Sequence, residues 1–275
     1  MNTALKALQL KARHQVYTLL SGNNLSKLHG EGYDFSELRE YQMGDDIRKI
    51  NWTITAKLGK PYIKELHANR ELSVVVAALM DGSLYFGTDN DKQKKLTETA
   101  ALLSYAAQVN GDIFTGIGYT RKETLLTPPT KQLFHVEHFS ERLYETPLLG
   151  TEIDVEHALK DLFARLHKAS LVFILGDFLE KLDLSLLAQK HEVIAVIIRH
   201  REEEFPKKLG EVTLRDPKSP EQTDTYFGRK SILRYRARLE ENDAKLAEHF
   251  ARYDIRSVKI FTDEEPLGKL MTLFR

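Results

Sequence analysis

The stretch that decides the fold is Leu72-Ser-Val-Val-Val-Ala-Ala-Leu-Met80, and Asp81-Gly82-Ser83 follows it directly. An apolar, β-branched run of this length that ends at Asp-Gly predicts a fully buried central strand. The carboxyl end of that strand carries a carboxylate and, two residues later, a hydroxyl. Ligands of open α/β sheets bind at this edge, so the pattern indicates a site for a small, hard cation such as Mg²⁺.

Composition limits the classes of function. The chain has 275 residues, of which 42% are hydrophobic, enough for one large domain with an extension. Basic and acidic side chains number 40 each, so the whole molecule offers no general attraction to nucleic acid or anionic lipid. No cysteine is present, which excludes disulfides, thiolate zinc sites and a cysteine nucleophile. The longest apolar runs are far shorter than a bilayer requires, so we expect a cytoplasmic protein without direct membrane insertion.

Beyond the first strand, strand patterns alternate with helix patterns. Strands are expected at 113–119, 124–126, 170–175, 193–198 and 257–261, helices at 96–107, 131–143, 155–166 and 232–250, and a small edge hairpin at 211–227. Alternation of this kind demands a mostly parallel sheet covered by helices on both faces, so the fold class is α/β with an open sheet.

The N-terminal part differs in character. Residues 4–20 favour a helix, whereas 30–68 are polar and rich in turn residues. We therefore expect an N-terminal helical and irregular extension in residues 1–68 and the α/β domain in residues 69–275. Three lysines, Lys92, Lys94 and Lys95, begin the helix after the central strand and are expected to form a solvated face.

Two further loops carry oxygen donors that could join Asp81 and Ser83. Thr151 precedes the amphipathic helix at 155–166, and Asp177 follows the buried strand at 170–175. Each has a structural alternative: Thr151 as the N-cap of its helix with Asp154 as capping partner, and Asp177 as an ordinary turn residue. A carboxylate that ends the most apolar strand must be hydrated, capped or bound, which favours a functional site at Asp81.

These positions resemble the von Willebrand factor A fold and its metal-ion-dependent adhesion site. That site combines Asp-x-Ser-x-Ser with a Thr in a second loop and an Asp in a third. Asp81 and Ser83 match the first motif, Thr151 the second and Asp177 the third, so the resemblance implies these four as Mg²⁺ ligands. Tyr85 stands where the second Ser is expected, and this departure removes one hydroxyl ligand.

Upstream, Asp34-Phe35-Ser-Glu-Leu-Arg39-Glu-Tyr41-Gln-Met-Gly44-Asp45-Asp46-Ile-Arg48-Lys-Ile-Asn51-Trp52 resembles the signature of the bacterial family called domain of unknown function 58. Asn51 replaces the usual Asp before Trp52. Many members are linked to MoxR-type AAA+ ATPases, and this resemblance implies an adaptor or scaffold role beside such an ATPase.

The charged residues of the signature allow two interpretations. Their acidic and basic side chains could form an ion-pair network that fixes the extension, with Trp52 and Tyr41 as packing anchors. Alternatively, the segment is a surface that binds a partner protein. The residues of that candidate surface are Arg39, Tyr41, Asp45, Asp46, Arg48 and Trp52.

Three functions remain open from the sequence. The leading one is a non-enzymatic interaction or adaptor domain that presents the Asp81 edge to a partner's carboxylate, directly or through Mg²⁺. The second is a metal-dependent, phosphatase-like hydrolase in which Asp81 attacks phosphorus and Asp177 holds the metal. The third is a structural domain without a metal, which Tyr85 suggests.

Overall fold

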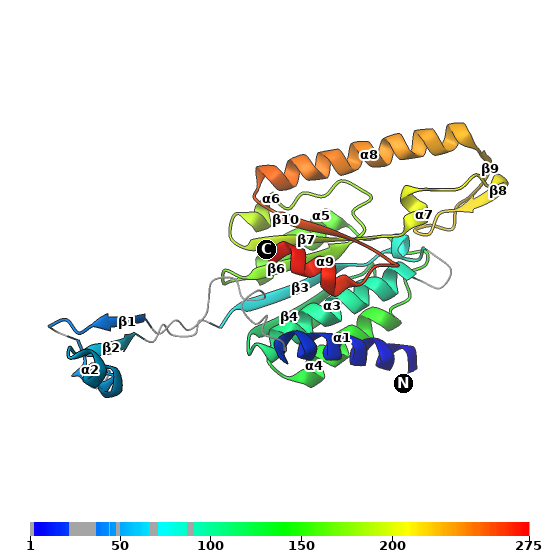
Figure 1. Cartoon of the computed structure of the whole chain (residues 1–275). Coiled ribbons are helices and arrows are strands. Elements are labelled where there is room, and N and C mark those ends of the chain that lie inside the picture. Colours follow the sequence, from blue (N-terminus) through cyan, green and yellow to red (C-terminus); the bar gives the residue numbers. More distant parts are fainter. Residues whose placement is uncertain are drawn as a thin grey trace.

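The structure is a computed structural model of the chain, and it describes residues 3–21, 37–43, 45–47, 50–65, 71–86 and 91–274. Its centre is a six-stranded sheet with the strand order β10-β7-β6-β3-β4-β5 (Figure 1). The strands are β3 Ser73–Leu79, β4 Ile113–Tyr119, β5 Thr124–Thr130, β6 Leu171–Gly176, β7 Glu192–Arg199 and β10 Arg256–Phe261. All neighbours pair in parallel except β4 and β5, which are antiparallel.

The alternation of side chains along β3 divides the core into two layers. Val74, Val76 and Ala78 point into one apolar cluster, and Val75, Ala77 and Leu79 point into the other. The first cluster is covered by α1 Thr3–Ser21, α3 Asp91–Val109, α4 Leu133–Glu145 and α9 Pro266–Met271. The second is covered by α5 Val155–Arg165, α6 Ser185–Ala188 and α8 Arg229–Arg252. The expected α/β class with helices on both faces is confirmed.

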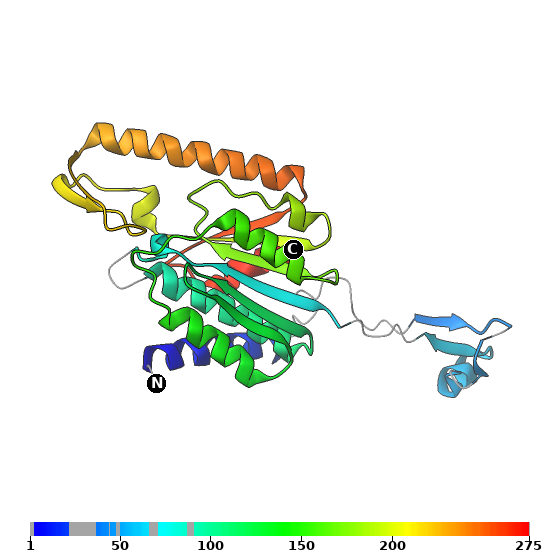
Figure 2. The same ribbon diagram turned by 180° about the vertical axis from the view of Figure 1, so that it is seen from behind.

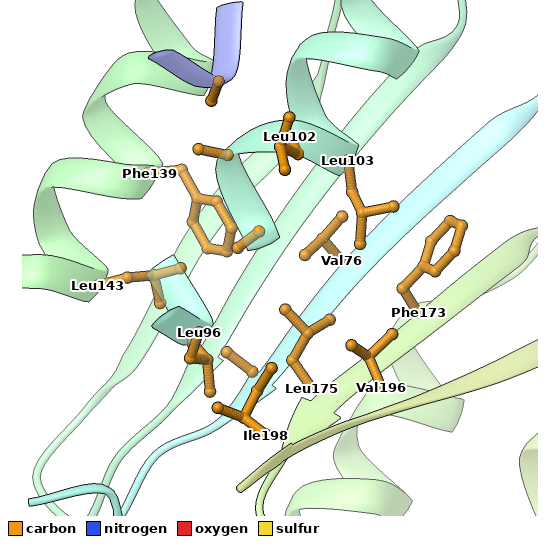
Figure 3. Packing of buried hydrophobic residues seen from close by; sticks show 14 of the residues in the cluster. Val76, Leu96, Leu102, Leu103, Phe139, Leu143, Phe173, Leu175, Val196 and Ile198 are labelled. Atoms are coloured by element: carbon orange, nitrogen blue, oxygen red, sulfur yellow. The ribbon is translucent and has the colours of Figure 1, made fainter. Parts of the chain in front are cut away.

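Figure 3 shows the packing of the first layer. Leu96, Leu102 and Leu103 of α3 and Phe139 and Leu143 of α4 lie over the strand residues of β3, β6 and β7. Burying side chains of this size contributes about 1.5–3 kcal/mol each, so the central sheet is the stable scaffold for its loop ends.

Two sheet details differ from the sequence-based expectation. Strand β5 runs through Pro128 and Pro129 to Thr130. Prolines are tolerated there because β5 is an edge strand, and its register with β4 shifts between Phe114 and Gly116. The hairpin of β8 Gly210–Arg215 and β9 Gln222–Phe227 does not extend the main sheet. It forms a separate two-stranded sheet that lies beside the start of α8 (Figure 2).

Helix α1 packs on the sheet domain, although the division at residue 68 places it with the extension. Leu5, Ala12 and Val16 are buried, and the Gln9 side-chain amide donates a 2.8 Å hydrogen bond to Ser140 Oγ on α4. The part of the extension that forms its own unit is therefore residues 37–65. This unit holds the antiparallel pair β1 Glu37–Glu40 and β2 Tyr62–Glu65 with α2 Trp52–Leu58, drawn apart from the main sheet in Figures 1 and 2.

Leucine truncation tests the packing of α1. Replacing Leu5 by alanine should lower the free energy of unfolding by about 2–5 kcal/mol, because a fully buried leucine leaves a cavity. Leu10→Ala on the same helix is the control, since Leu10 is 65% exposed and should change stability little. Urea unfolding measures both variants, and equal effects would contradict the packing of α1 on the sheet domain.

Candidate functional site

The candidate site lies where the carboxyl ends of β3 and β6 meet. The chain leaves β3 for β4 on one side and places β6 on the other, so this edge is a topological switch point, where ligand crevices form. Asp81 caps the 3-10 turn η3 Gly82–Leu84 by accepting a 2.9 Å hydrogen bond from the Ser83 backbone N–H. The Ser83 hydroxyl also donates to Asp81 Oδ1. Asp81 and Ser83 therefore act as one unit.

Asp177, one residue beyond β6, faces a lysine from the start of α3. Lys92 Nζ lies 2.8 Å from Asp177 Oδ2 and 2.5 Å from Glu203 Oε1, and the Lys92 side chain is fully buried. Glu203 comes from the short helix α7 Arg201–Glu204, where its other carboxylate oxygen accepts from the His200 N–H. The expectation of a solvated face at Lys92 is wrong, because the helix points this residue down at the sheet edge.

A second lysine contacts Asp81 itself. Lys218 lies in the loop between β8 and β9, and its Nζ is 2.9 Å from Asp81 Oδ2 and 2.5 Å from Glu180 Oε1. Asp81, Asp177, Glu180 and Lys218 line one small pocket at this edge. Both oxygens of Asp81 are therefore engaged, and an attack by this carboxylate on a substrate would require Lys218 to move.

The other two positions of the adhesion-type pattern do not supply free ligands. Thr151 donates its hydroxyl to the Leu148 carbonyl over 2.6 Å, and its own carbonyl accepts from the Gly82 N–H over 2.7 Å. Thr151 is not the N-cap of α5, since Asp154 has that role through the His157 N–H. The Tyr85 side chain is exposed at the surface. Thr151 thus joins the site through its backbone.

Arg199 fixes the turn that carries Asp177. Its buried guanidinium donates to the Asp177 carbonyl over 2.6 Å and to the Phe178 carbonyl over 3.2 Å. It also binds Asp243 of α8 over 2.9 Å. Phe178 has a φ of 48°, an unfavourable conformation for a residue with a side chain, and Asn242 also donates to its carbonyl. The turn after β6 is therefore tied to α8.

The charges of the site stabilise one another. Burial alone would raise the pKa of Asp177, but the positive charge and hydrogen bond of Lys92, with help from Ser83 and Arg199, lower it. Burial likewise disfavours charged Lys218, yet its hydrogen bonds to Glu180 and Asp81 raise its pKa. Asp177 and Lys218 are therefore both ionised at neutral pH.

This donor set does not fit Mg²⁺. Asp81 and Asp177 already contact ammonium groups, the Thr151 hydroxyl is used by a carbonyl, and Tyr85 removes one hydroxyl. In the described part of the chain, no three His, Asp or Glu side chains gather in a way that could hold a metal ion. A divalent ion would need several oxygen ligands at once and would meet two fixed positive charges here.

The family-signature unit of residues 37–65 presents a different kind of site. Asn51 caps α2 by accepting from the Ile54 N–H, a role that Asp serves equally well, and Gly59 ends the helix at a φ of 71°. Trp52 is 65% exposed, so the expectation that it anchors the extension by packing is wrong. Tyr41 is partly exposed and its N–H donates to the Pro61 carbonyl.

The remaining residues of the candidate partner surface are placed only in part. Asp45 accepts a 2.8 Å hydrogen bond from the Gln42 N–H, which closes a tight turn, and Asp46 follows it. Arg39 lies in β1 opposite Ile63, and Arg48 lies outside the described residues. The same unit carries four large apolar side chains that are exposed: those of Met43, Ile47, Trp52 and Leu58.

Sequence reasoning missed five residues of the site: Lys92, Glu180, Arg199, Glu203 and Lys218. A lysine near a helix N-terminus normally faces solvent, since its charge is unfavourable beside the helix dipole. The one available signal is the apolar pattern of α3, which places Lys92 four residues before the buried Leu96 and so on the inner face. No local pattern indicates that Lys218 reaches Asp81, because the contact depends on how the hairpin folds back.

In the part of the chain that the structure describes, no helix combines the length and apolar character that a membrane crossing requires. Among solved structures, the chain is similar to the conserved hypothetical protein BatB from Bacteroides thetaiotaomicron. The TM-score is 0.40 and the identity 11%, over 66% of this chain and 98% of that one. It is also similar to an aerotolerance-related membrane protein from Bacteroides fragilis, with a TM-score of 0.35 and 11% identity over 64% and 96% of the two chains.

Sequence comparison is more specific. Uncharacterized proteins from Mycobacterium bovis and Mycobacterium tuberculosis are 28% identical to this chain over 224 residues, which is 78% of this chain and 70% of theirs. The family model described as protein of unknown function DUF58 matches residues 37–246, from the first strand of the signature unit into α8. It thus includes the signature unit, Lys92, the Asp81 edge and Lys218, and this protein belongs to the DUF58 family.

Proposed function

We propose that this chain is a non-enzymatic interaction domain, a von Willebrand factor A-like sheet domain that docks a partner protein through its signature unit. The observation that carries the proposal is the exposure of four large apolar side chains, Met43, Ile47, Trp52 and Leu58, on a unit of only 29 residues, 37–65. Several exposed aromatic, methionine and aliphatic side chains on so small a unit are typical of a protein interaction surface.

The Asp81 edge is a weaker candidate for the docking surface. Asp81 is 8% exposed, and Lys218 and Glu180 complete its ion pairs from within the chain. A partner's carboxylate would find no cation with an open position at this edge. We therefore assign partner binding to the signature unit, although the sequence pattern favoured the Asp81 edge for it.

The proposed partner is an AAA+ ATPase of the MoxR type, as the family resemblance implies. In this role the sheet domain is the rigid body, and the signature unit supplies the contact residues Tyr41, Asp45, Asp46 and Trp52. Arg39 and Arg48 belong to the same proposed surface. Such an encounter would take place in the cytoplasm, where the ATPase has its nucleotide.

Capture of the ATPase tests the proposal. Purified chain, immobilised at one point, is mixed with the purified MoxR-type ATPase of the same organism, with and without a chelator. Trp52→Ala should lose the larger part of the retained ATPase, because one buried Trp at an interface centre contributes 2 kcal/mol or more, about thirtyfold in affinity. In a buffer without ADP, adding the chelator should not change the amount of ATPase that the wild-type chain retains.

Phe134→Ala is the matched control. Phe134 is 70% exposed on α4 of the sheet domain, so its replacement removes a similar aromatic surface from a region outside the proposed contact. Retention of the ATPase by Trp52→Ala at the wild-type level, or equal losses in both variants, would refute docking through the signature unit.

A further inference from the structure

We propose that Lys92 and Lys218 take the place of a divalent cation at the Asp81 edge, so that Asp177 and Asp81 each have a cationic partner without any metal. The inference goes beyond the docking proposal, because it concerns a different part of the molecule. Its basis is the disagreement between the adhesion-type residues of the sequence and the contacts that those residues make.

Each lysine joins two carboxylates. Lys92 bridges Asp177 and Glu203, and Lys218 bridges Asp81 and Glu180, at distances between 2.5 and 2.9 Å. Two ammonium groups bring the same total charge as one divalent ion. The two lysines come from parts of the chain that are far apart in sequence: Lys92 from the start of α3 and Lys218 from the loop of the β8–β9 hairpin.

Burial distinguishes three of these pairs from surface ion pairs, whereas in the fourth, Lys218–Glu180, the glutamate is 61% exposed. The Lys92 side chain is fully buried and the Asp81 and Asp177 side chains are only 11% and 12% exposed. A buried charge persists only when it is paired and hydrogen-bonded, so removal of either partner is costly. The two lysines are therefore integral structural parts of the site.

The loop that carries Lys218 is held in place by contacts that do not involve its ammonium group. The Pro217 carbonyl accepts from the Gly150 N–H over 2.8 Å, and Asp216 accepts from the Lys218 N–H over 2.9 Å and from Ser219 Oγ over 2.8 Å. A Cβ on Gly82 would lie 2.0 Å from the Pro217 carbonyl oxygen, so the loop sits directly on the Asp81 turn. The backbone contacts of the β8–β9 loop therefore place Lys218 beside Asp81.

Manganese binding tests this inference, with Mn²⁺ as a paramagnetic probe for a hard divalent cation. We expect the wild-type chain to leave the free Mn²⁺ signal unchanged and to have the same melting temperature with EDTA or Mg²⁺. Lys218→Ala frees Asp81 Oδ2 and should bind Mn²⁺ at least about tenfold more tightly than the wild type. Adding Asp81→Asn to Lys218→Ala should abolish the gained binding.

Lys218→Arg is the matched control, since it keeps the positive charge and should bind no Mn²⁺. Circular dichroism establishes that each variant is folded. Tight Mn²⁺ binding by the wild-type chain that Asp81→Asn removes would overturn the inference, and so would a Lys218→Ala variant that binds no more Mn²⁺ than the wild type. Neither result depends on whether Trp52 docks an ATPase, so this inference and the docking proposal fail separately.

Discussion

Replacing Lys92 by methionine should lower the free energy of unfolding by about 3–5 kcal/mol at neutral pH, because it leaves two buried carboxylates without their cation. Asp177 and Glu203 would face each other across the space where Lys92 Nζ now lies 2.8 and 2.5 Å from them. Methionine keeps the length and apolar stem of lysine, so the loss reports the charge rather than a cavity. Urea unfolding measures it.

The pH dependence separates the charge from packing. In the wild-type chain the lowered pKa of Asp177 adds stability above about pH 4, the ordinary value of Asp, and that stability is lost as the pH falls through the lower folded value. In Lys92→Met the burial that opposes ionisation is no longer offset, so the folded-state pKa of Asp177 should rise. Protonation then stabilises the variant as the pH falls, although Ser83 and Arg199 still face this carboxylate.

The difference in stability between wild type and Lys92→Met should therefore shrink between pH 7 and about pH 5. Lys160→Met is the control, since Lys160 also contacts a carboxylate over 2.5 Å, that of Glu156, but at the exposed surface of α5. It should change stability little at any pH. A Lys92→Met variant as stable as Lys160→Met would show that the buried ion pairs do not support the site.

Replacing Gly82 by alanine should destabilise the fold by about 1–3 kcal/mol, because the added Cβ would lie 2.0 Å from the Pro217 carbonyl oxygen. Backbone atoms on both sides are fixed, since Gly82 donates to the Thr151 carbonyl and Pro217 accepts from Gly150. Relief requires the β8–β9 loop to move off the turn and to carry Lys218 away from Asp81. Thermal unfolding together with limited proteolysis of residues 216–221 measures both effects.

Gly268→Ala is the opposite control. Gly268 is an exposed position of α9, and a Cβ there meets nothing within 4 Å. Alanine is the better helix former, so this substitution should stabilise the protein by about 0.4–1 kcal/mol. If Gly82→Ala unfolds at the wild-type temperature and its loop stays resistant to protease, the loop does not lie on the Asp81 turn as the structure has it.

Much of the fold could be predicted from periodicity. The run ending at Met80 is the central strand, and its alternate residues enter the two core layers, because a strand buried on both faces must be apolar at every position. The ends of helices and strands were harder to predict from the sequence. The strand at Thr124 continues through Pro128 and Pro129 because only an edge strand tolerates residues that cannot donate to a neighbour.

By itself the sequence determined the central strand, the α/β class and the meeting of Asp81, Ser83 and Asp177 at one edge, because parallel strands align their carboxyl ends. It also marked the signature segment as a candidate surface. Only the tertiary structure decided what neutralises the aspartates. Lys92 and Lys218 lie 85 and 137 residues from the aspartates they contact, and no local pattern encodes a pairing of that range. Long-range packing of α3 and of the β8–β9 loop brings both lysines to the site.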